Sequence, residues 1–394
     1  MLTFHSLRVV DIHPEAEDAV GISLEVPPEL RDAYRGLPGQ HIVVRTDIND
    51  EENRRTYSLV NAPGEWPLRI VARVHPSGQM SRYLSEQLSA GDHLDVLPPN
   101  GSFTPRRAQA GGSYVAFASG CGITPILAIA RALLAAHPDN RVMVFYGNAS
   151  TGRTMCLEEL LALKDRYLQR LSLHFVMSRE PQEVELYNGR IDGARVRQFA
   201  QALFAPAGVT EYFVCGPGNM LDEVSTSLRE LGVEADRIHG EHFTVATTSG
   251  AAAESPAAAG PAGSVRPDGR VQSSGSARAD AAARPETMAP HAAEKPALAA
   301  DQCEVTILMD GRRRTFTMQM NDEVVLDAAA RAGLELPFSC RAGVCSTCRT
   351  KVVKGAVAMA QNYALEEWEV EQGYVLACQS HVKTPLLELD YDEK

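Results

Sequence analysis

The chain has 394 residues, of which 44% are hydrophobic, and a formal net charge of -12 at pH 7. This length predicts two to four domains, each large enough for its own core. The negative charge argues against nucleic acids and anionic membranes as partners, and no apolar run approaches the roughly 18 residues of a membrane-spanning helix. The N-terminus has no signal-peptide pattern and the cysteines no disulfide-framework spacing, so we expect a cytoplasmic protein.

Residues 1–107 have the pattern of a β-rich domain. Short alternating runs are separated by turns such as Pro27-Pro28 and Pro38-Gly39, which is typical of an antiparallel barrel or sandwich. We expect strands over 4–12, 20–26, 41–46 and 68–74, and one helix over 81–88.

One strand of this domain reads Arg55-Thr56-Tyr57-Ser58-Leu59. By alternation Arg55, Tyr57 and Leu59 share a face, and Ser58 points the other way. The functional interpretation is a flavin site, in which Arg55 pairs with a phosphate, Tyr57 stacks on the isoalloxazine and Ser58 hydrogen-bonds near the reactive N5. The alternative is an exposed strand that places a tyrosine on the core.

A glycine turn, Gly78-Gln79-Met80-Ser81, precedes the predicted helix of the first domain. The free N–H groups and the positive dipole end of a helix N-terminus suit a pyrophosphate. The alternative is that Ser81 only caps the helix.

Residues 108–243 alternate between short apolar strands and amphipathic helices, which predicts a parallel, doubly wound sheet. We expect strands over 114–119, 141–147, 171–176, 211–215 and 237–243. We expect helices over 125–137, 156–166, 192–203 and 219–231.

The loop after the first of these strands has the position of a dinucleotide phosphate loop. It reads Gly120-Cys121-Gly122-Ile123-Thr124-Pro125. A proline replaces the third glycine of the usual fingerprint, and Gly147-Asn148 stand where an acidic residue would end the second strand. An ordinary Rossmann dehydrogenase is therefore disfavoured.

Two further strand ends in this domain suggest nucleotide contacts. Ser178-Arg179 could hold a ribose 2′-phosphate and favour NADPH over NADH, although ordinary surface polarity explains the pair equally well.

The other strand end begins at Cys215, and a glycine-rich turn of this kind lets a nicotinamide approach the backbone. It reads Cys215-Gly216-Pro217-Gly218-Asn219-Met220. The alternative for Cys215 is a buried structural thiol.

Residues 244–300 are rich in alanine, proline, glycine and serine and contain no aromatic residue. Such a composition cannot bury a core, so we expect a disordered linker. Six prolines weaken the alternative of an alanine-rich helix.

Four of the five cysteines in residues 301–394 are separated by four, two and 29 intervening residues, the plant-type spacing for a [2Fe–2S] cluster. The expected ligands are Cys340, Cys345, Cys348 and Cys378. A zinc site is disfavoured because only one Cys-x-x-Cys pair is present. A disulfide pairing is disfavoured because nothing else in the chain looks secreted. We expect strands over 303–309, 314–320, 349–353 and 374–378, and a helix over 324–332.

Together these motifs resemble the ferredoxin–NADP⁺ reductase superfamily, with a ferredoxin domain at the C-terminus as in oxygenase reductases. Softer segments, such as Pro38-Gly39-Gln40-His41 and the run from Gly373 to Gln379, resemble the reductase subunits of phenylacetyl-CoA epoxidases. The resemblance implies three domains: an antiparallel β-barrel FAD domain, a doubly wound α/β NADP domain and an α+β β-grasp ferredoxin domain.

The resemblance also implies roles and partners. Thr124 and Cys215 would line the nicotinamide pocket, and Phe243 would cover the second flavin face until nicotinamide displaces it. The cofactors would be FAD, NADPH (with NADH as the alternative) and a [2Fe–2S] cluster, and a di-iron oxygenase would receive the electrons. Two alternatives are a reductase for a Rieske aromatic-ring dioxygenase or other monooxygenase, and a carrier that no longer oxidises NADPH.

Overall fold

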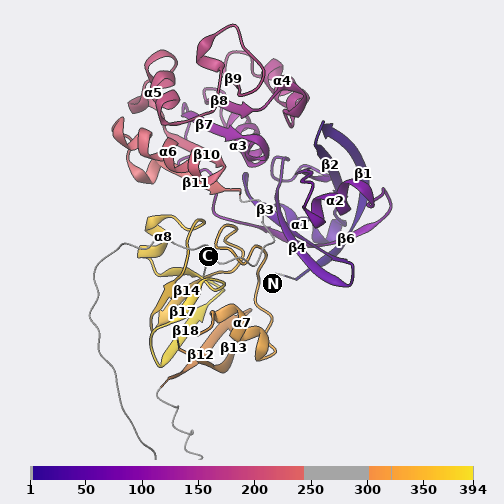
Figure 1. The fold of residues 1–394 in the computed structure, drawn as a ribbon, viewed down its shortest axis with the longest axis vertical. Helices are drawn as coiled ribbons and strands as arrows, with labels where there is room; N and C mark the ends of the chain where they lie inside the picture. Colours follow the sequence, from indigo (N-terminus) through magenta and orange to yellow (C-terminus); the bar gives the residue numbers. More distant parts are fainter. Residues whose placement is uncertain (1–2, 244–300, 321, 394) are drawn as a thin grey trace, which may run out of the picture. The chain divides into compact units, whose positions relative to one another are not determined.

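The computed structural model describes residues 3–243, 301–320 and 322–393, all of which fall within one compact unit (Figure 1). The linker predicted over 244–300 lies outside the described residues. Within the described parts, the three sheets follow one another along the chain: an antiparallel sheet, a parallel sheet and a mixed sheet.

The N-terminal sheet has six strands in the order β4-β3-β6-β1-β2-β5. A bridge between Leu59, just after β4, and Ile70 in β5 joins the first and last strands of this order, so the sheet closes into a barrel. The strands are β1 (His5–Ala16), β2 (Ala19–Glu25), β3 (His41–Ile48), β4 (Glu51–Ser58), β5 (Leu68–Arg73) and β6 (His93–Asn100).

The barrel confirms the strands expected at β1, β2, β3 and β5. Its helix α2 (Gln79–Glu86) begins two residues before the predicted start and buries Met80 and Leu84. The sequence analysis missed β6 and the short helix α1 (Arg31–Tyr34). Both contain prolines or charges that interrupt the apolar alternation, and β6 is held by its neighbours β1 and β3.

The second sheet is parallel, with strand order β11-β10-β7-β8-β9. Its strands are β7 (Ser113–Ser119), β8 (Arg141–Asn148), β9 (Leu171–Met177), β10 (Glu211–Gly216) and β11 (Ile238–His242). Its helices are α3 (Ile123–Ala136), α4 (Leu157–Arg166), α5 (Gly193–Ala202) and α6 (Gly218–Glu230). Buried residues of α3 and α4 belong to one core cluster and those of α5 and α6 to another, so helices cover both faces of the sheet, as the doubly wound prediction requires.

The barrel and the α/β domain share part of one core. Val60, Val71 and Phe103 from the barrel side cluster with Ile126 and Leu127 of α3. Burial of apolar side chains across this boundary stabilises the two domains as one body, by about 25 cal/mol for each Å² of apolar surface removed from water.

The C-terminal domain has a mixed sheet, in the order β13-β12-β18-β14-β16, and a separate pair, β15 and β17. Its strands are β12 (Gln302–Met309), β13 (Arg312–Gln319), β14 (Arg349–Lys354), β15 (Val357–Met359), β16 (Tyr374–Leu376), β17 (Ser380–Val382) and β18 (Leu386–Asp390). Its helices are α7 (Val325–Arg331) and α8 (Glu367–Glu371). The hairpin, α7, β14 and β16 confirm the expected elements. The short elements β15, β17, β18 and α8 were not expected.

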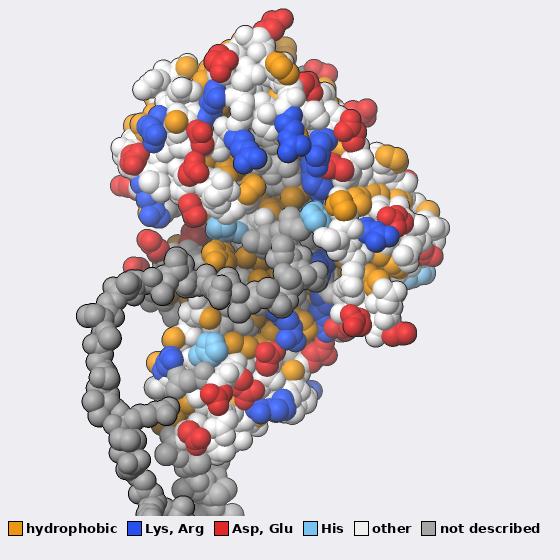
Figure 2. Space-filling model, viewed as in Figure 1, with side chains coloured by type: hydrophobic (Ala, Val, Ile, Leu, Met, Phe, Trp, Pro, Cys, Tyr) orange, Lys and Arg blue, Asp and Glu red, His pale blue; other side chains and the backbone are white. Residues whose placement is uncertain are grey.

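Acidic and basic side chains are interspersed on the face of the molecule that Figure 2 shows. None of the helices in the described parts of the chain is long and apolar enough to cross a membrane.

Candidate functional site

Some of the residues predicted to bind the flavin and the cluster meet at one cavity of about 150 Å³. Ser58 and Arg55 of the barrel line it, as do Phe243 after β11 and Cys340 and Cys345 of the C-terminal domain. Its other lining residues are His41, Thr56, Glu241, His242, Ser339, Ala342 and Val344. Side chains from three domains therefore surround one small space.

Arg55 and Ser58 lie at the end of β4. Ser58 is buried and pairs in register with His41 of β3. The Arg55 guanidinium donates to the carbonyl oxygen of Arg54 at 2.7 Å, and within the described part of the chain no carboxylate is paired with it. A partly buried cation without an anion suits the phosphate that the sequence analysis proposed for it.

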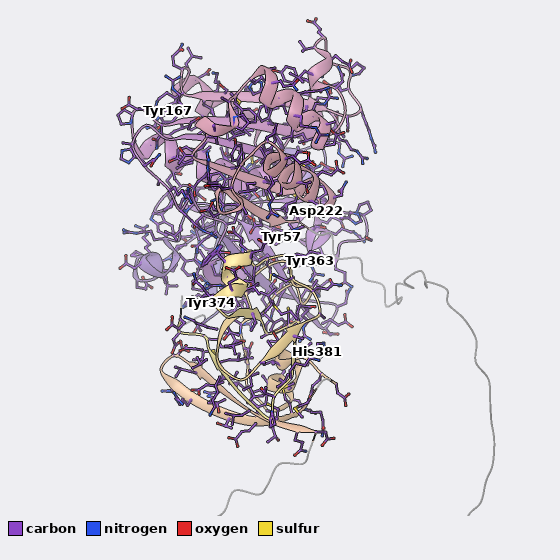
Figure 3. All side chains as sticks on the ribbon, turned by 90° about the vertical axis from the view of Figure 1, so that its left-hand side faces the viewer. Tyr57, Tyr167, Asp222, Tyr363, Tyr374 and His381 are labelled. Atoms are coloured by element: carbon purple, nitrogen blue, oxygen red, sulfur yellow. The ribbon has the colours of Figure 1, made fainter. Side chains whose placement is uncertain are left out.

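Tyr57 lies between these two residues but does not line the cavity. Its ring packs against the barrel core, together with Leu59, and burial raises the pKa of its hydroxyl (Figure 3 labels Tyr57). The predicted stacking of Tyr57 on a flavin ring stays a prediction. The structure shows only that core packing fixes its position.

Gly78 is the residue directly before α2, and its backbone is extended. The Ser81 hydroxyl donates to the carbonyl of Gly78 at 3.2 Å and accepts from the N–H of His75 at 3.1 Å, so Ser81 stabilises the turn itself. Met80 is buried in the barrel core, so only its backbone is available to a phosphate, whereas Gln79 is exposed.

The glycine loop after β7 touches the turn after β10. A methyl group added to Gly122 would lie 2.0 Å from the carbonyl oxygen of Cys215, so only glycine allows this approach. The Thr124 hydroxyl donates to the carbonyl of Cys121 at 2.9 Å. Ile123 and Pro125 are buried in the first turn of α3, and Gly120 takes a positive φ of 56°. The two loops thus form one backbone-lined edge at the carboxyl ends of the strands.

Cys215 is fully buried, and burial raises the pKa of its thiol well above the ordinary range. Beside it, the N–H of Phe243 donates to the carbonyl of Gly216 at 3.1 Å, which ties the aromatic residue to this turn. Pro217 precedes α6, and Met220 packs in its first turn against Gly216. A neutral, buried thiol fits a pocket wall better than a nucleophile.

Ser178 and Arg179 lie directly after β9 and are exposed. Their N–H groups bond to the carbonyls of Asn148 and Ala149, which fixes the backbone beside the end of β8. Among the described residues, no carboxylate pairs with the Arg179 side chain. This cation is therefore available to an anionic ligand at the carboxyl edge of the sheet.

The four cysteines of the predicted cluster site come together in the C-terminal domain. The Cys340 thiolate accepts hydrogen bonds from the thiols of Cys345 and Cys378, which hold its pKa well below the ordinary value. Cys378 also lies within hydrogen-bond reach of Cys348. The sulfurs thus contact one another in pairs, and among the described residues no three metal-binding side chains converge on a single ion. Four thiols in contact fit a two-iron cluster.

The cysteine loop directs backbone N–H groups at sulfur. The N–H groups of Ala342 and Val344 each lie 3.4 Å from the Cys340 sulfur. Gly343 has a φ of 74°, which glycine adopts without strain, and the loop returns through Tyr363, whose N–H donates to the Gly343 carbonyl. These donors stabilise negative charge on the cluster ligands.

Sequence reasoning gave no role to two buried polar residues of the cavity. His41 Nδ1 lies 3.5 Å from Glu241 Oε1, while His41 Nε2 and Glu241 Oε2 are buried without a hydrogen-bond partner in the described structure. Unpartnered buried polar atoms are costly, so they fit a cavity that receives a polar ligand such as a flavin ring. Only their spatial proximity identifies them, since 200 positions separate them in the chain.

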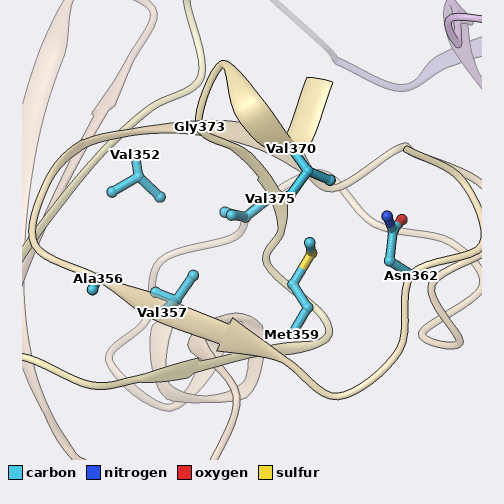
Figure 4. A pocket seen from close by; sticks show the side chains of 8 residues that line it. All are labelled: Val352, Ala356, Val357, Met359, Asn362, Val370, Gly373 and Val375. Atoms are coloured by element: carbon cyan, nitrogen blue, oxygen red, sulfur yellow. The ribbon is translucent and has the colours of Figure 1, made fainter. Parts of the chain in front are cut away.

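A larger cavity of about 530 Å³ lies within the C-terminal domain (Figure 4). Most of its lining is aliphatic, including Val352, Val357, Val370 and Val375. It lacks the convergent polar groups that orient a ligand, so we place the chemistry at the smaller cavity.

Comparison with protein families finds three matches along the chain. An oxidoreductase FAD-binding domain matches residues 7–104, an oxidoreductase NAD-binding domain matches 117–226, and a 2Fe-2S iron-sulfur cluster binding domain matches 307–383. The cavity residues from the barrel and the cysteine loop lie inside the first and third of these domains.

Whole proteins also align with the chain. One of the subunits of the 1,2-phenylacetyl-CoA epoxidase of Escherichia coli (strain K12) is 36% identical, and the alignment covers 100% of this chain and 99% of that relative. The 3-ketosteroid-9-alpha-monooxygenase ferredoxin reductase component of Rhodococcus rhodochrous is 28% identical, with 98% and 96% covered. Phthalate dioxygenase reductase, a solved structure, superposes with a TM-score of 0.53 at 20% identity, and 98% of each chain is covered. Its likeness shows the same fold.

Proposed function

Because this chain belongs to the ferredoxin–NADP⁺ reductase superfamily and is a relative of a phenylacetyl-CoA epoxidase component, we propose that it passes electrons from NADPH to a di-iron oxygenase that epoxidises phenylacetyl-CoA. The chain is an oxidoreductase with FAD-binding, NAD-binding and cluster-binding domains. The nucleotide preference and the nature of the oxygenase are the proposed parts.

The observation that carries this proposal is the shared cavity. Ser58 and Phe243 lie on one side of it and Cys340 and Cys345 on the other. Bound FAD supplies hydride acceptance and single-electron release, and the cluster supplies one-electron transport. Because both sets of residues line one space of about 150 Å³, the groups that they would hold would lie near each other.

Each residue has a defined task in this account. Arg55 and the α2 turn would hold the negative phosphates, and the buried Ser58 hydroxyl would hydrogen-bond the reactive edge of the flavin. Cys215 and Thr124 would shape the nicotinamide pocket. Phe243, whose N–H donates to the carbonyl of Gly216, would cover one flavin face. The cysteine thiolates would hold the irons, and the N–H groups that face the Cys340 sulfur would offset their negative charge.

The test of this function combines the purified reductase with the oxygenase subunits of a phenylacetyl-CoA epoxidase. We expect NADPH oxidation to rise when phenylacetyl-CoA is added and the epoxide to form. If NADPH reduces the flavin and the cluster but the rate of NADPH oxidation does not depend on phenylacetyl-CoA, the chain passes its electrons to another oxygenase. The 3-ketosteroid monooxygenase relative, which also aligns over the whole chain, supports that second candidate.

The preference for NADPH is proposed from Arg179. Its exposed side chain is not paired with a carboxylate in the described part of the chain, and it lies where a ribose 2′-phosphate could reach it. A charge-assisted hydrogen bond contributes about 1.5–3 kcal/mol, so Arg179→Gln should raise the KM for NADPH roughly 10- to 100-fold and leave the KM for NADH unchanged. Steady-state kinetics with both nucleotides measure this.

The matched control for that experiment is Arg141→Gln. Arg141 begins β8 at the opposite, amino end of the sheet and is exposed, so its loss should change neither KM. Equal effects of Arg179→Gln on NADPH and NADH would contradict the assignment, as would no effect on either.

A further inference from the structure

A histidine of the α/β domain lies between carboxylates from two domains. His239 in β11 is fully buried. Its Nε2 lies 2.8 Å from Oε1 of Glu211, the first residue of β10, and its Nδ1 lies 3.2 Å from Oε1 of Glu366, which caps α8 of the C-terminal domain. Both ring nitrogens face acceptors, and imidazole donates from both nitrogens only when it is protonated.

Arg106, in the segment before β7, completes the contact. Its guanidinium donates to Glu366 Oε2 at 2.7 Å and lies over the Trp368 ring, 4.5 Å from the centroid. Trp368 Nε1 donates to the same oxygen at 2.8 Å. The N–H of Arg106 donates to Glu211 Oε1 at 3.0 Å. Both oxygens of Glu366 are therefore engaged by the α/β side of the molecule or by its own tryptophan.

We call Arg106, Glu211, His239 and Glu366 the docking cluster. With His239 protonated it contains two cations and two anions. With His239 neutral it carries one excess negative charge. Phe213, whose ring lies 5.3 Å from the His239 ring, adds no charge. Of the charged groups nearby, Arg107 pairs with Asp236 and Glu369 pairs with Arg349.

The acidic run from Glu366 to Glu371 is consequently not a uniformly solvated face. Glu369 is fully buried and Glu366 is mostly buried, whereas Glu367 and Glu371 are exposed. A run of acidic residues suggests a surface that steers a basic partner, but the first and third acidic residues of this run are not available for that role. These two acidic side chains make contacts inside the molecule.

We propose that Glu366 and Trp368 form the surface by which the C-terminal domain docks on the α/β domain, and that Arg106, Glu211 and His239 bind this surface more tightly when His239 is protonated. The partner of the α/β surface is thus the chain's own α8 segment. Undocking would remove the Glu366 carboxylate from His239 and leave only Glu211.

The direction of the pH dependence follows from the contacts. Burial alone would lower the pKa of His239, but the hydrogen bonds to Glu211 and Glu366 outweigh it and hold the pKa above the ordinary value. Burial alone would raise the pKa values of Glu211 and Glu366, but hydrogen bonds and charge interactions with His239, Arg106 and neighbouring donors together outweigh it and hold both values below the ordinary range. Protonation of His239 therefore contributes fully to docking below the undocked-state pKa of this histidine, and this contribution is lost as pH rises through its docked-state pKa.

A second contact, which joins the C-terminal domain to the barrel, lacks a group that titrates near neutrality. Arg54 of β4 donates to Glu335 Oε1 at 2.8 Å, and its guanidinium lies over the Phe338 ring at 4.1 Å. This contact strengthens docking at every pH in the neutral range. Removing this contact offers a control in which docking weakens but its pH dependence does not change.

The experiment is small-angle X-ray scattering of the full-length protein with its cofactors, from pH 6 to 9, fitted to docked and undocked states. Each unit by which docking raises the pKa of His239 changes the docked-to-undocked ratio about tenfold across this range. We expect that ratio to fall as pH rises. His239→Gln should make the docked-to-undocked ratio independent of pH. Replacement of the exposed His93 by glutamine should leave the pH dependence of the ratio as it is in the wild type. A flat wild-type curve, or a pH-dependent His239→Gln variant, would overturn the proposal.

Glu366→Gln keeps the proposal testable if His239→Gln folds poorly. Removing one member of a buried charge pair should lower the docked-to-undocked ratio at pH 6 at least about tenfold. The exposed neighbour Glu367→Gln should leave the ratio unchanged, and Arg54→Gln should lower it equally at every pH. A ratio that Glu366→Gln does not change at pH 6 would refute docking through α8.

Discussion

Replacing Cys378 with alanine should abolish electron delivery to an oxygenase while leaving reduction of the flavin by NADPH at its wild-type rate. The Cys378 thiol contacts both Cys340 and Cys348, so its loss removes the ligand that joins the cysteine loop to the returning chain. Two irons then lack a fourth thiolate. Electron paramagnetic resonance of the dithionite-reduced protein measures the cluster, and stopped-flow absorbance measures the flavin.

The matched control is Cys303→Ala. Cys303 is a buried thiol of the same domain that lies outside the predicted ligand set, and its thiol donates to the carbonyl of Glu304. It should lose stability, by a cavity cost of roughly 1 kcal/mol, but keep the cluster signal. A Cys378→Ala protein with a full cluster signal would show that the ligand set is different.

Replacing Gly122 with alanine should disable the nucleotide site and destabilise the α/β domain. The new methyl group would lie 2.0 Å from the carbonyl oxygen of Cys215 and 3.1 Å from the N of Gly216. Both contacts are backbone atoms, so the two loops have to separate. Overpacking of this kind costs about 1–3 kcal/mol or more, and it moves Cys215 away from its place at the strand end.

We expect flavin reduction by NADPH to fall at least about tenfold in this variant, since a displaced pocket wall costs more than about 1.4 kcal/mol of positioning. Reduction by dithionite, which needs no nucleotide site, should be unchanged. Gly208→Ala is the control, because a methyl group there meets no atom within 4 Å. An NADPH rate within twofold of wild type would mean that the two loops do not form the nucleotide edge.

The parts of the fold that the sequence predicted are those set by local patterns. The strand and helix alternation of the α/β domain appears with ends shifted by one or two residues, because each element carries its own apolar period. The short strands β15 and β17 contain three residues each, too few for any period to show. They form through pairing with each other across the chain.

The candidate site divides in the same way. Cysteine spacing identifies the cluster loop because the ligands are close in the sequence. The pairs His41–Glu241 and His239–Glu366 are separated by more than 100 positions, and no local pattern joins them. In Glu369 the local pattern is misleading. A run of charged residues predicts a solvated face, but the carboxylate of Glu369 is buried beside Arg349. Tertiary packing decides whether such residues are buried and which partners they contact.

The central claim is that one chain carries electrons from nicotinamide through a flavin to its own cluster. Anaerobic mixing of the purified protein with NADPH tests it most directly, with flavin absorbance and the cluster's paramagnetic signal followed together. The account predicts that flavin absorbance bleaches first and the reduced-cluster signal then appears at a rate independent of protein concentration. A flavin that NADPH reduces while the cluster stays oxidised, or a cluster rate that rises with protein concentration, would contradict transfer within the chain.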